Sequence, residues 1–75
     1  MQRPSSDSCD AQRQFGLNVK RTRQDRGLTQ EQLAELAQLQ PSYVSAVERG
    51  VRNITICNMA RIAKALDVKI AELMS

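Results

Sequence analysis

Hydrophobic residues recur along this chain at the three- and four-residue spacing of α-helices, and no segment alternates as a β-strand would. The first periodic segment covers residues 11–26 and places Phe15, Val19 and Thr22 on one face. Gly27 follows it, and glycine commonly ends a helix in a left-handed conformation. The pattern predicts a helix over residues 11–26, preceded by a flexible N-terminal tail over residues 1–10, which has no hydrophobic period.

Two short helices are predicted in the middle of the chain. Thr29 is a good N-cap, and Gln32 completes the capping-box pattern three residues later. Pro41 suits a first helical position, and it disfavours a helical conformation at the preceding Gln40. The second helix is expected to bury Leu33, Leu36 and Ala37 and to end near Ala37, and the third begins at Pro41, buries Val44 and Val47, and is closed by Gly50. Only residues 38–40 separate the two helices.

Two further helices complete the predicted fold. Thr55 can cap a fourth helix, and residues 70–74 form a short fifth one. The stripe of the fourth helix has a period close to 3.6 residues and consists of Ile56, Met59, Ile62, Ala63 and Leu66. The predicted fold class is therefore all-α, a five-helix domain over residues 11–75.

The composition excludes several classes of function. Phe15 and Tyr43 are the only aromatic residues, which argues strongly against a stacking platform for single-stranded nucleic acid. His is absent, and Cys9 and Cys57 lie too far apart for a zinc finger, so we expect no metal site. Catalytic motifs are also missing, and we expect neither an enzyme nor a cofactor. The chain has no signal-peptide pattern or membrane-span pattern, which indicates a cytoplasmic protein.

The charge is mildly basic, with a formal net charge of +3 and a sequence pI near 9.3. Lys20, Arg21, Arg23 and Arg26 fall within seven residues, and Arg49 and Arg52 form a second group. Binding to a polyanion such as DNA is one interpretation of these groups. Solvation of an exposed helix face is the other, and composition does not decide between them.

Residues 30–49 have the pattern of a helix-turn-helix. Two short helices joined by three residues cross steeply, which requires a small residue at the contact and a hydrophobic wedge in the turn. Ala34 and Leu39 meet these two requirements. In such a pair the second helix protrudes, and a protruding helix fits the major groove of DNA.

The chain resembles the lambdoid repressor and Cro family, the Xre-type helix-turn-helix proteins, over residues 15–73. The resemblance is carried by RGLTQEQLAELA (26–37), SYVSAVERG (42–50) and IAKAL (62–66). Within the family, ERGVRNIT (48–55) looks most like the controller proteins of restriction–modification systems. Three positions depart from the family pattern: Gln38 and Asp67 stand where glycine is common, and Thr22 replaces an aliphatic residue. A left-handed backbone at Gln38 would cost about 1–2 kcal/mol.

The resemblance implies a set of DNA contacts. The base-facing positions are Pro41, Ser42, Tyr43, Ser45 and Ala46, with Arg52 expected to reach a base or a narrow minor groove. The phosphate contacts are Thr29, Gln30, Gln40, Arg49 and Asn53. The alternative for Tyr43 is a partly buried ring, and for the other polar residues it is simple solvation.

The family also pairs an Arg of the first helix with a Glu near the end of the third, which implies a structural ion pair of Arg23 and Glu48 here. Cys57 is interpreted as a small apolar core residue, with a redox switch as its alternative.

One reading helix contacts few base pairs, which favours a homodimer on a palindromic, double-stranded operator. We expect Ile56, Met59, Ile70, Leu73 and Met74 to form its interface, although the same residues could close the monomer core. The predicted function is an autoregulatory transcription regulator, with RNA polymerase as a further candidate partner. The alternatives are an antitoxin that also binds a toxin, and a protein-interaction module that binds no DNA.

Overall fold

The structure is a computed structural model, and it describes residues 10–75 of the chain. This part contains five α-helices and no strand, which confirms the all-α prediction. The helices are α1 (Asp10–Asp25), α2 (Gln30–Ala37), α3 (Pro41–Glu48), α4 (Ile56–Leu66) and α5 (Ile70–Met74). Of the predicted tail, residues 1–9 lie outside the described residues together with Cys9, and Asp10 is the first residue of α1.

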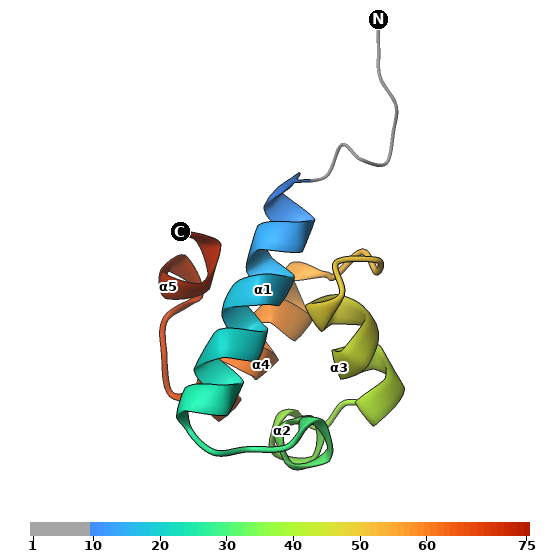
Figure 1. Ribbon diagram of the computed structural model, residues 1–75, viewed down its shortest axis with the longest axis vertical. Helices are drawn as coiled ribbons and strands as arrows, with labels where there is room; N and C mark the ends of the chain where they lie inside the picture. Colours follow the sequence, from blue (N-terminus) through green and yellow to red (C-terminus); the bar gives the residue numbers. More distant parts are fainter. Residues whose placement is uncertain (1–9) are drawn as a thin grey trace, which may run out of the picture.

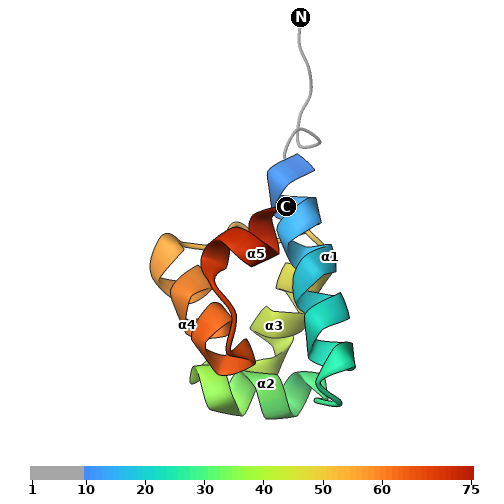
Figure 2. The same cartoon turned by 90° about the vertical axis from the view of Figure 1, so that its left-hand side faces the viewer.

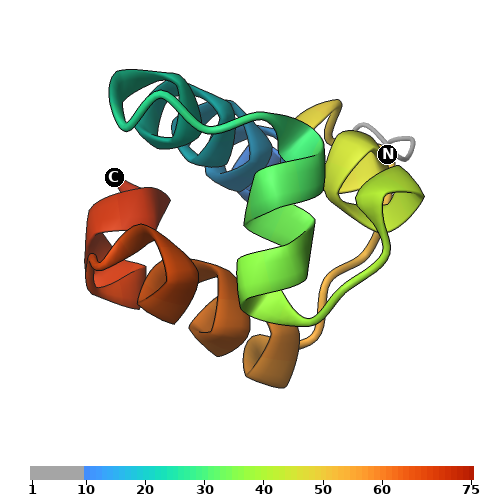
Figure 3. The ribbon, with the colours of Figure 1, turned by 90° about the horizontal axis from the view of Figure 1, so that it is seen from below.

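Helix α1 lies alongside three of the other helices. It packs against α3, α4 and α5 (Figure 1). Helix α2 lies across the lower end of the molecule and packs on α3 and α4 (Figures 2 and 3). The helix-turn-helix is thereby held from two sides, by α1 and by α4.

The core is built from one aromatic and many aliphatic side chains. Its members are Phe15, Val19, Leu33, Ala34, Ala37, Val44, Val47, Ile62, Ala63, Leu66 and Leu73. Two predicted core positions are wrong: Leu36 is 58% exposed and Ile56 is 72% exposed. On α2 the small Ala34 faces the core instead of Leu36, and the buried residues of α4 lie in its second half, so its first turn is at the surface.

Close backbone contact joins α1 to the end of α3. A Cβ atom at Gly16 would clash with the carbonyl oxygen of Val47 and lie 3.0 Å from that of Glu48. The amide of Gln12 adds a hydrogen bond of 2.9 Å to the carbonyl oxygen of Gly50. Only a residue without a side chain lets α1 approach α3 this closely.

The predicted helix ends are confirmed by the local geometry. Thr29 Oγ1 accepts a hydrogen bond from the backbone N–H of Gln32, whose side chain accepts one from the N–H of Thr29. Thr55 caps α4 in the same way through the N–H of Asn58. Gly27 has a φ of +70°. These contacts satisfy donors that a helix start otherwise leaves unpaired.

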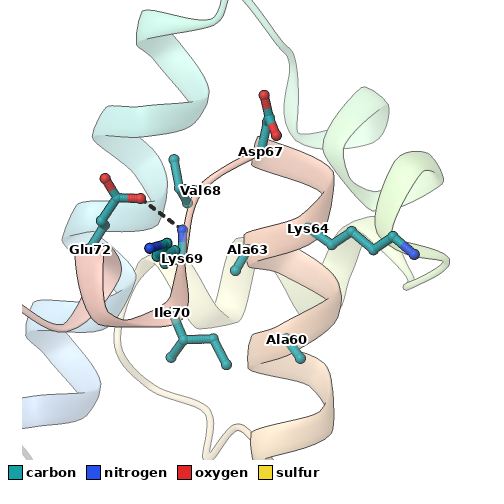
Figure 4. Close-up of a pocket in the computed structure, with 8 residues that line it drawn as sticks. All are labelled: Ala60, Ala63, Lys64, Asp67, Val68, Lys69, Ile70 and Glu72. Carbon is teal, nitrogen blue, oxygen red and sulfur yellow. Dashed lines mark hydrogen bonds between the residues drawn. The ribbon is translucent and has the colours of Figure 1, made fainter.

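A shallow hollow separates α4 from α5 and has a volume of about 540 Å³ (Figure 4). At its edge, Glu72 Oε1 accepts a hydrogen bond of 2.7 Å from the N–H of Lys69, which fixes the start of α5. The side chain of Ile70 extends from α5 toward α4 in this view. Part of the apolar lining of the hollow is therefore accessible from outside.

Candidate nucleic-acid interface

The turn between α2 and α3 has the expected wedge and a left-handed residue. Gln38, at a position where the family commonly has glycine, adopts the left-handed conformation with φ 60° and ψ 43°. The N–H of Leu39 donates to the carbonyl oxygen of Ala34 at 2.8 Å, and the Leu39 side chain packs against the core. The turn thus fixes the angle at which α3 leaves α2.

A buried ion pair anchors the C-terminal end of α3. Arg23 Nε lies 2.6 Å from Glu48 Oε2, and Arg23 Nη2 lies 3.1 Å from Oε1, so the pair is bidentate. The side chains of Arg23 and Glu48 are only 11% and 2% exposed. Arg23 Nη1 also donates to the carbonyl oxygen of Leu28. The predicted pair of Arg23 and Glu48 is confirmed, and it joins α1, the loop before α2 and the end of α3.

Gln30, one of the phosphate candidates, contacts this ion pair. Its side-chain nitrogen donates a hydrogen bond of 3.0 Å to Glu48 Oε1. An amide nitrogen carries two protons, so one remains available to a phosphate oxygen. The Glu48 bond orients the side chain of Gln30 before any ligand arrives.

The predicted base-reading residues all lie outside the core. Pro41, Ser42 and Arg52 are exposed, whereas Tyr43, Ser45 and Ala46 are half-buried. The remaining phosphate candidates, Thr29, Gln40, Arg49 and Asn53, are also exposed. A surface hollow of about 530 Å³ brings the turn, the start of α3 and the following loop together, lined by Gln38, Leu39, Gln40, Ser42, Tyr43 and Arg52.

Tyr43 lies at the centre of a small polar arrangement. The guanidinium carbon of Arg52 is 5.0 Å from the centroid of its ring. Its hydroxyl accepts a hydrogen bond of 3.1 Å from Asn58 Nδ2 on α4. The ring packs against the core, as the alternative for Tyr43 expected, and its hydroxyl lies in a polar contact within the protein. Contact of Tyr43 with DNA stays a prediction. Asn58 was not predicted, since its partner is fifteen residues away in the sequence.

Two other predictions are corrected. Cys57 is exposed and does not fill the core. Leu73, a predicted dimer residue, is 1% exposed and packs inside the monomer, so it offers no surface to a second copy. The remaining candidates for the dimer interface are accessible to different degrees: Met59 and Ile70 are half-buried, whereas Ile56 and Met74 are exposed. The basic residues Lys20 and Arg21 of α1 are exposed as well.

Two other kinds of feature, a membrane-spanning helix and a metal-binding cluster, are absent from residues 10–75. None of the helices there combines the length and apolar character that a membrane crossing requires. The same residues hold no group of three or more His, Cys, Asp or Glu side chains placed to bind a metal ion.

A short helix pair with a fixed turn, a buried anchor and a second helix that begins at the surface defines a helix-turn-helix domain. The helix-turn-helix family model matches residues 19–73. The chain belongs to this family, and it is a DNA-binding transcription regulator.

Among its relatives are control proteins. Control protein C.SmaI of Serratia marcescens is 36% identical over 74 residues, which cover 96% of this chain and 88% of that protein. Control protein C.BamHI of Bacillus amyloliquefaciens is 38% identical, with 80% and 75% covered. The crystal structure of the restriction-modification controller protein C.AhdI from Aeromonas hydrophila has a TM-score of 0.80 and 44% identity, covering 81% of this chain and 92% of that one. A hypothetical transcription factor from Neisseria has a TM-score of 0.85 and 33% identity, covering 100% and 86%.

Proposed function

We propose that this protein binds a palindromic operator as a homodimer and controls transcription there, including that of its own gene. The observation that carries the proposal is the exposed start of α3, at Pro41 and Ser42, on a helix whose C-terminal end is fixed by the Arg23–Glu48 pair. A helix held in this way presents the same side chains to the major groove at every encounter. The relatives named as restriction-modification controller proteins support a regulatory role of this kind.

The reading set comes from the start of α3 and the loop behind it. Ser42 and Ser45 offer hydroxyl groups that can donate to or accept from base edges, and Pro41 and Ala46 offer apolar contacts to thymine methyl groups. Arg52 adds a long cationic side chain beside them. This set is small, so we expect sequence-dependent DNA shape to contribute to selectivity.

The phosphate contacts are arranged around that reading set. Thr29 and Gln30 lie at the start of α2, where free backbone N–H groups favour an anion. Gln40 precedes α3, and its side chain makes no capping hydrogen bond. Arg49 and Asn53 belong to the loop after α3. In this arrangement, phosphates on both sides of the groove would fix the register of the helix.

The dimer surface is proposed on the α4–α5 side of the molecule. Ile56 and Ala60 are one helical turn apart on α4, both are exposed, and Ala60 lines the hollow that Ile70 borders (Figure 4). Ile56 is 72% exposed, and together with Ala60 and the half-buried Ile70 it gives this side of the molecule an apolar surface for a second copy to cover. A second copy related by twofold symmetry would cover this side and place two α3 helices about 10 base pairs apart.

The test of this function is selection of bound sequences from randomised duplex DNA at two salt concentrations. We expect an inverted repeat to be enriched at both concentrations. Enrichment of no motif, with binding that disappears as salt rises, would leave only phosphate attraction and would contradict the proposal. Co-purification of a protein partner in that case would favour the antitoxin alternative.

Sedimentation of two matched variants tests the dimer surface. Ile56→Glu places a charge on the proposed interface and should yield a monomer. Leu36→Glu places the same charge at another exposed apolar residue, on α2, and should leave the dimer intact. Equal effects of the two substitutions would exclude this surface.

A further inference from the structure

The hydrogen bond from Asn58 to Tyr43 leaves the hydroxyl proton of the tyrosine available to a ligand. Tyr43 Oη accepts a hydrogen bond of 3.1 Å from Asn58 Nδ2, so the phenol acts as the acceptor in this contact and does not use its own proton. The ring is half-buried and packs against the core, which restricts it to one orientation. The hydroxyl proton thus remains a donor, on a ring that borders the exposed hollow at the start of α3.

The same ring orients a second DNA-facing side chain. Arg52 lies over the Tyr43 ring with its guanidinium carbon 5.0 Å from the centroid, a distance at which a cation is attracted by an aromatic face. Arg52 is exposed and comes from the loop after α3. A long side chain on a loop loses much rotational freedom when it binds, and contact with a fixed ring reduces that loss.

The position of Asn58 is itself fixed by the start of α4, so its side chain can hold Tyr43 in place. It lies in the first turn of α4, where its backbone N–H donates to Thr55 Oγ1 at 3.2 Å. The backbone contact is independent of the side chain, which is therefore free to reach α3. The contacts thus run from α4 to the start of α3 and on to the loop: Asn58 to Tyr43, and Tyr43 to Arg52.

We propose that Asn58 is a positioning residue for DNA recognition, which holds Tyr43 as a proton donor toward an acceptor on DNA and, through its ring, orients Arg52. The proposal rests on the operator binding proposed above. The acceptor is a base atom such as guanine N7 or O6 or thymine O4. A cytosine or adenine amino group at that place is itself a donor and cannot accept the Tyr43 proton, so these bases would be disfavoured there.

The experiment compares the wild-type protein with Asn58→Ala on the operator duplex recovered by selection and on an unrelated duplex. We expect operator affinity to fall about three- to tenfold, the effect of losing one neutral hydrogen bond. Affinity for the unrelated duplex should not change. The melting temperature should be retained, because the Thr55 cap remains and alanine is a better helix former than asparagine. Cys57→Ala, one residue away on the exposed surface, is the matched control and should behave as the wild type.

Two further measurements separate positioning from a general structural role. In a Tyr43→Phe background, Asn58→Ala should have no additional effect on operator affinity, because its partner has been removed. Tyr43 is the only tyrosine in the chain, so the Cζ signal of protein labelled with ¹³C-tyrosine reports on this hydroxyl alone. Asn58→Ala should shift that signal in the free protein, and Cys57→Ala should not.

The outcomes distinguish this inference from the function on which it rests. An unchanged tyrosine signal, or an equal loss of affinity with and without the Tyr43 hydroxyl, would overturn the role of Asn58 while operator binding stands. If the wild-type protein selects no motif at all, the proposed function fails first, and the role of Asn58 in recognition fails with it.

Discussion

The C-terminal end of α3 is held by tight and buried contacts, whereas its first two residues carry small side chains that face solvent. At the held end, Gly16 allows α1 to touch the backbone, and the Glu48 side chain, only 2% exposed, is bound by Arg23 and Gln30. At the free end, Pro41 and Ser42 are exposed. On the function proposed above, stability and recognition are assigned to different ends of one eight-residue helix.

This division has a physical advantage. Substitutions at the free end alter few packing contacts, so the DNA sequence that is read can change without loss of the fold. Substitutions at the held end leave buried groups unpaired and act on the whole domain.

Glu48→Ala should have the largest effect. It leaves the Arg23 guanidinium buried without its partner, which costs about 3–5 kcal/mol of unfolding free energy, comparable to the total stability of a domain of this size. Folding should therefore be lost before sequence specificity, as measured by a thermal melt followed by circular dichroism. A melt unchanged from that of the wild type would show that the pair does not hold α3.

Gly16→Ala should come next. The added methyl group meets the carbonyl oxygens of Val47 and Glu48, so α1 must move away from α3, at a cost of about 1–3 kcal/mol. Lys20→Ala, at an exposed position of the same helix, serves as the control and should be close to neutral. Urea unfolding of the two variants measures the difference, and equal stability would contradict the close packing of α1 on α3.

Arg52→Ala and Arg49→Ala should separate base reading from phosphate binding at the free side. We expect Arg52→Ala to cost about 1–3 kcal/mol of operator binding and to relax the selected motif. Arg49→Ala should reduce the slope of log affinity against log salt by about one and leave the motif unchanged. Arg21→Ala, an exposed arginine of α1, should change neither. Identical behaviour of the first two variants would contradict their separate roles.

Gln38→Gly should have the smallest effect and the opposite sign. Gln38 has a φ of 60°, which glycine adopts without strain, so the variant should gain about 0.5–1 kcal/mol after the entropic cost of glycine. Asp67 has a φ of 61°, but aspartate tolerates this region better, so Asp67→Gly should gain less. Chemical unfolding of both variants provides the ranking, and a loss of stability in Gln38→Gly would contradict the strain at the turn.

The features that depend on local interactions could be predicted from the sequence. Helix ends at Thr29, Pro41 and Thr55 follow from capping and from the fixed geometry of proline, which act within a few residues. The left-handed Gly27 has the same local origin. The Arg23–Glu48 pair spans distant residues, and it was predicted through the family resemblance rather than from spacing.

The features that were missed depend on how helices meet. Leu36 and Leu33 look equivalent in a periodic pattern, yet only Leu33 faces the core, because Ala34 occupies the close contact of α2. Asn58 has no sequence signal that connects it to Tyr43. Leu73 could have covered either a partner or the monomer, and only the packing of α5 against α1 decides.

The most direct test of the account is a map of backbone amide shifts when ¹⁵N-labelled protein binds the selected operator duplex. We expect the largest changes at the start of α2, in residues 40–46 and in residues 49–53, with the middle of α1 little affected. The contrary result would be changes centred on the basic residues Lys20 and Arg21 of α1, with residues 40–53 unaltered. DNA would then bind through a charged helix face, and α3 would not be the reading element.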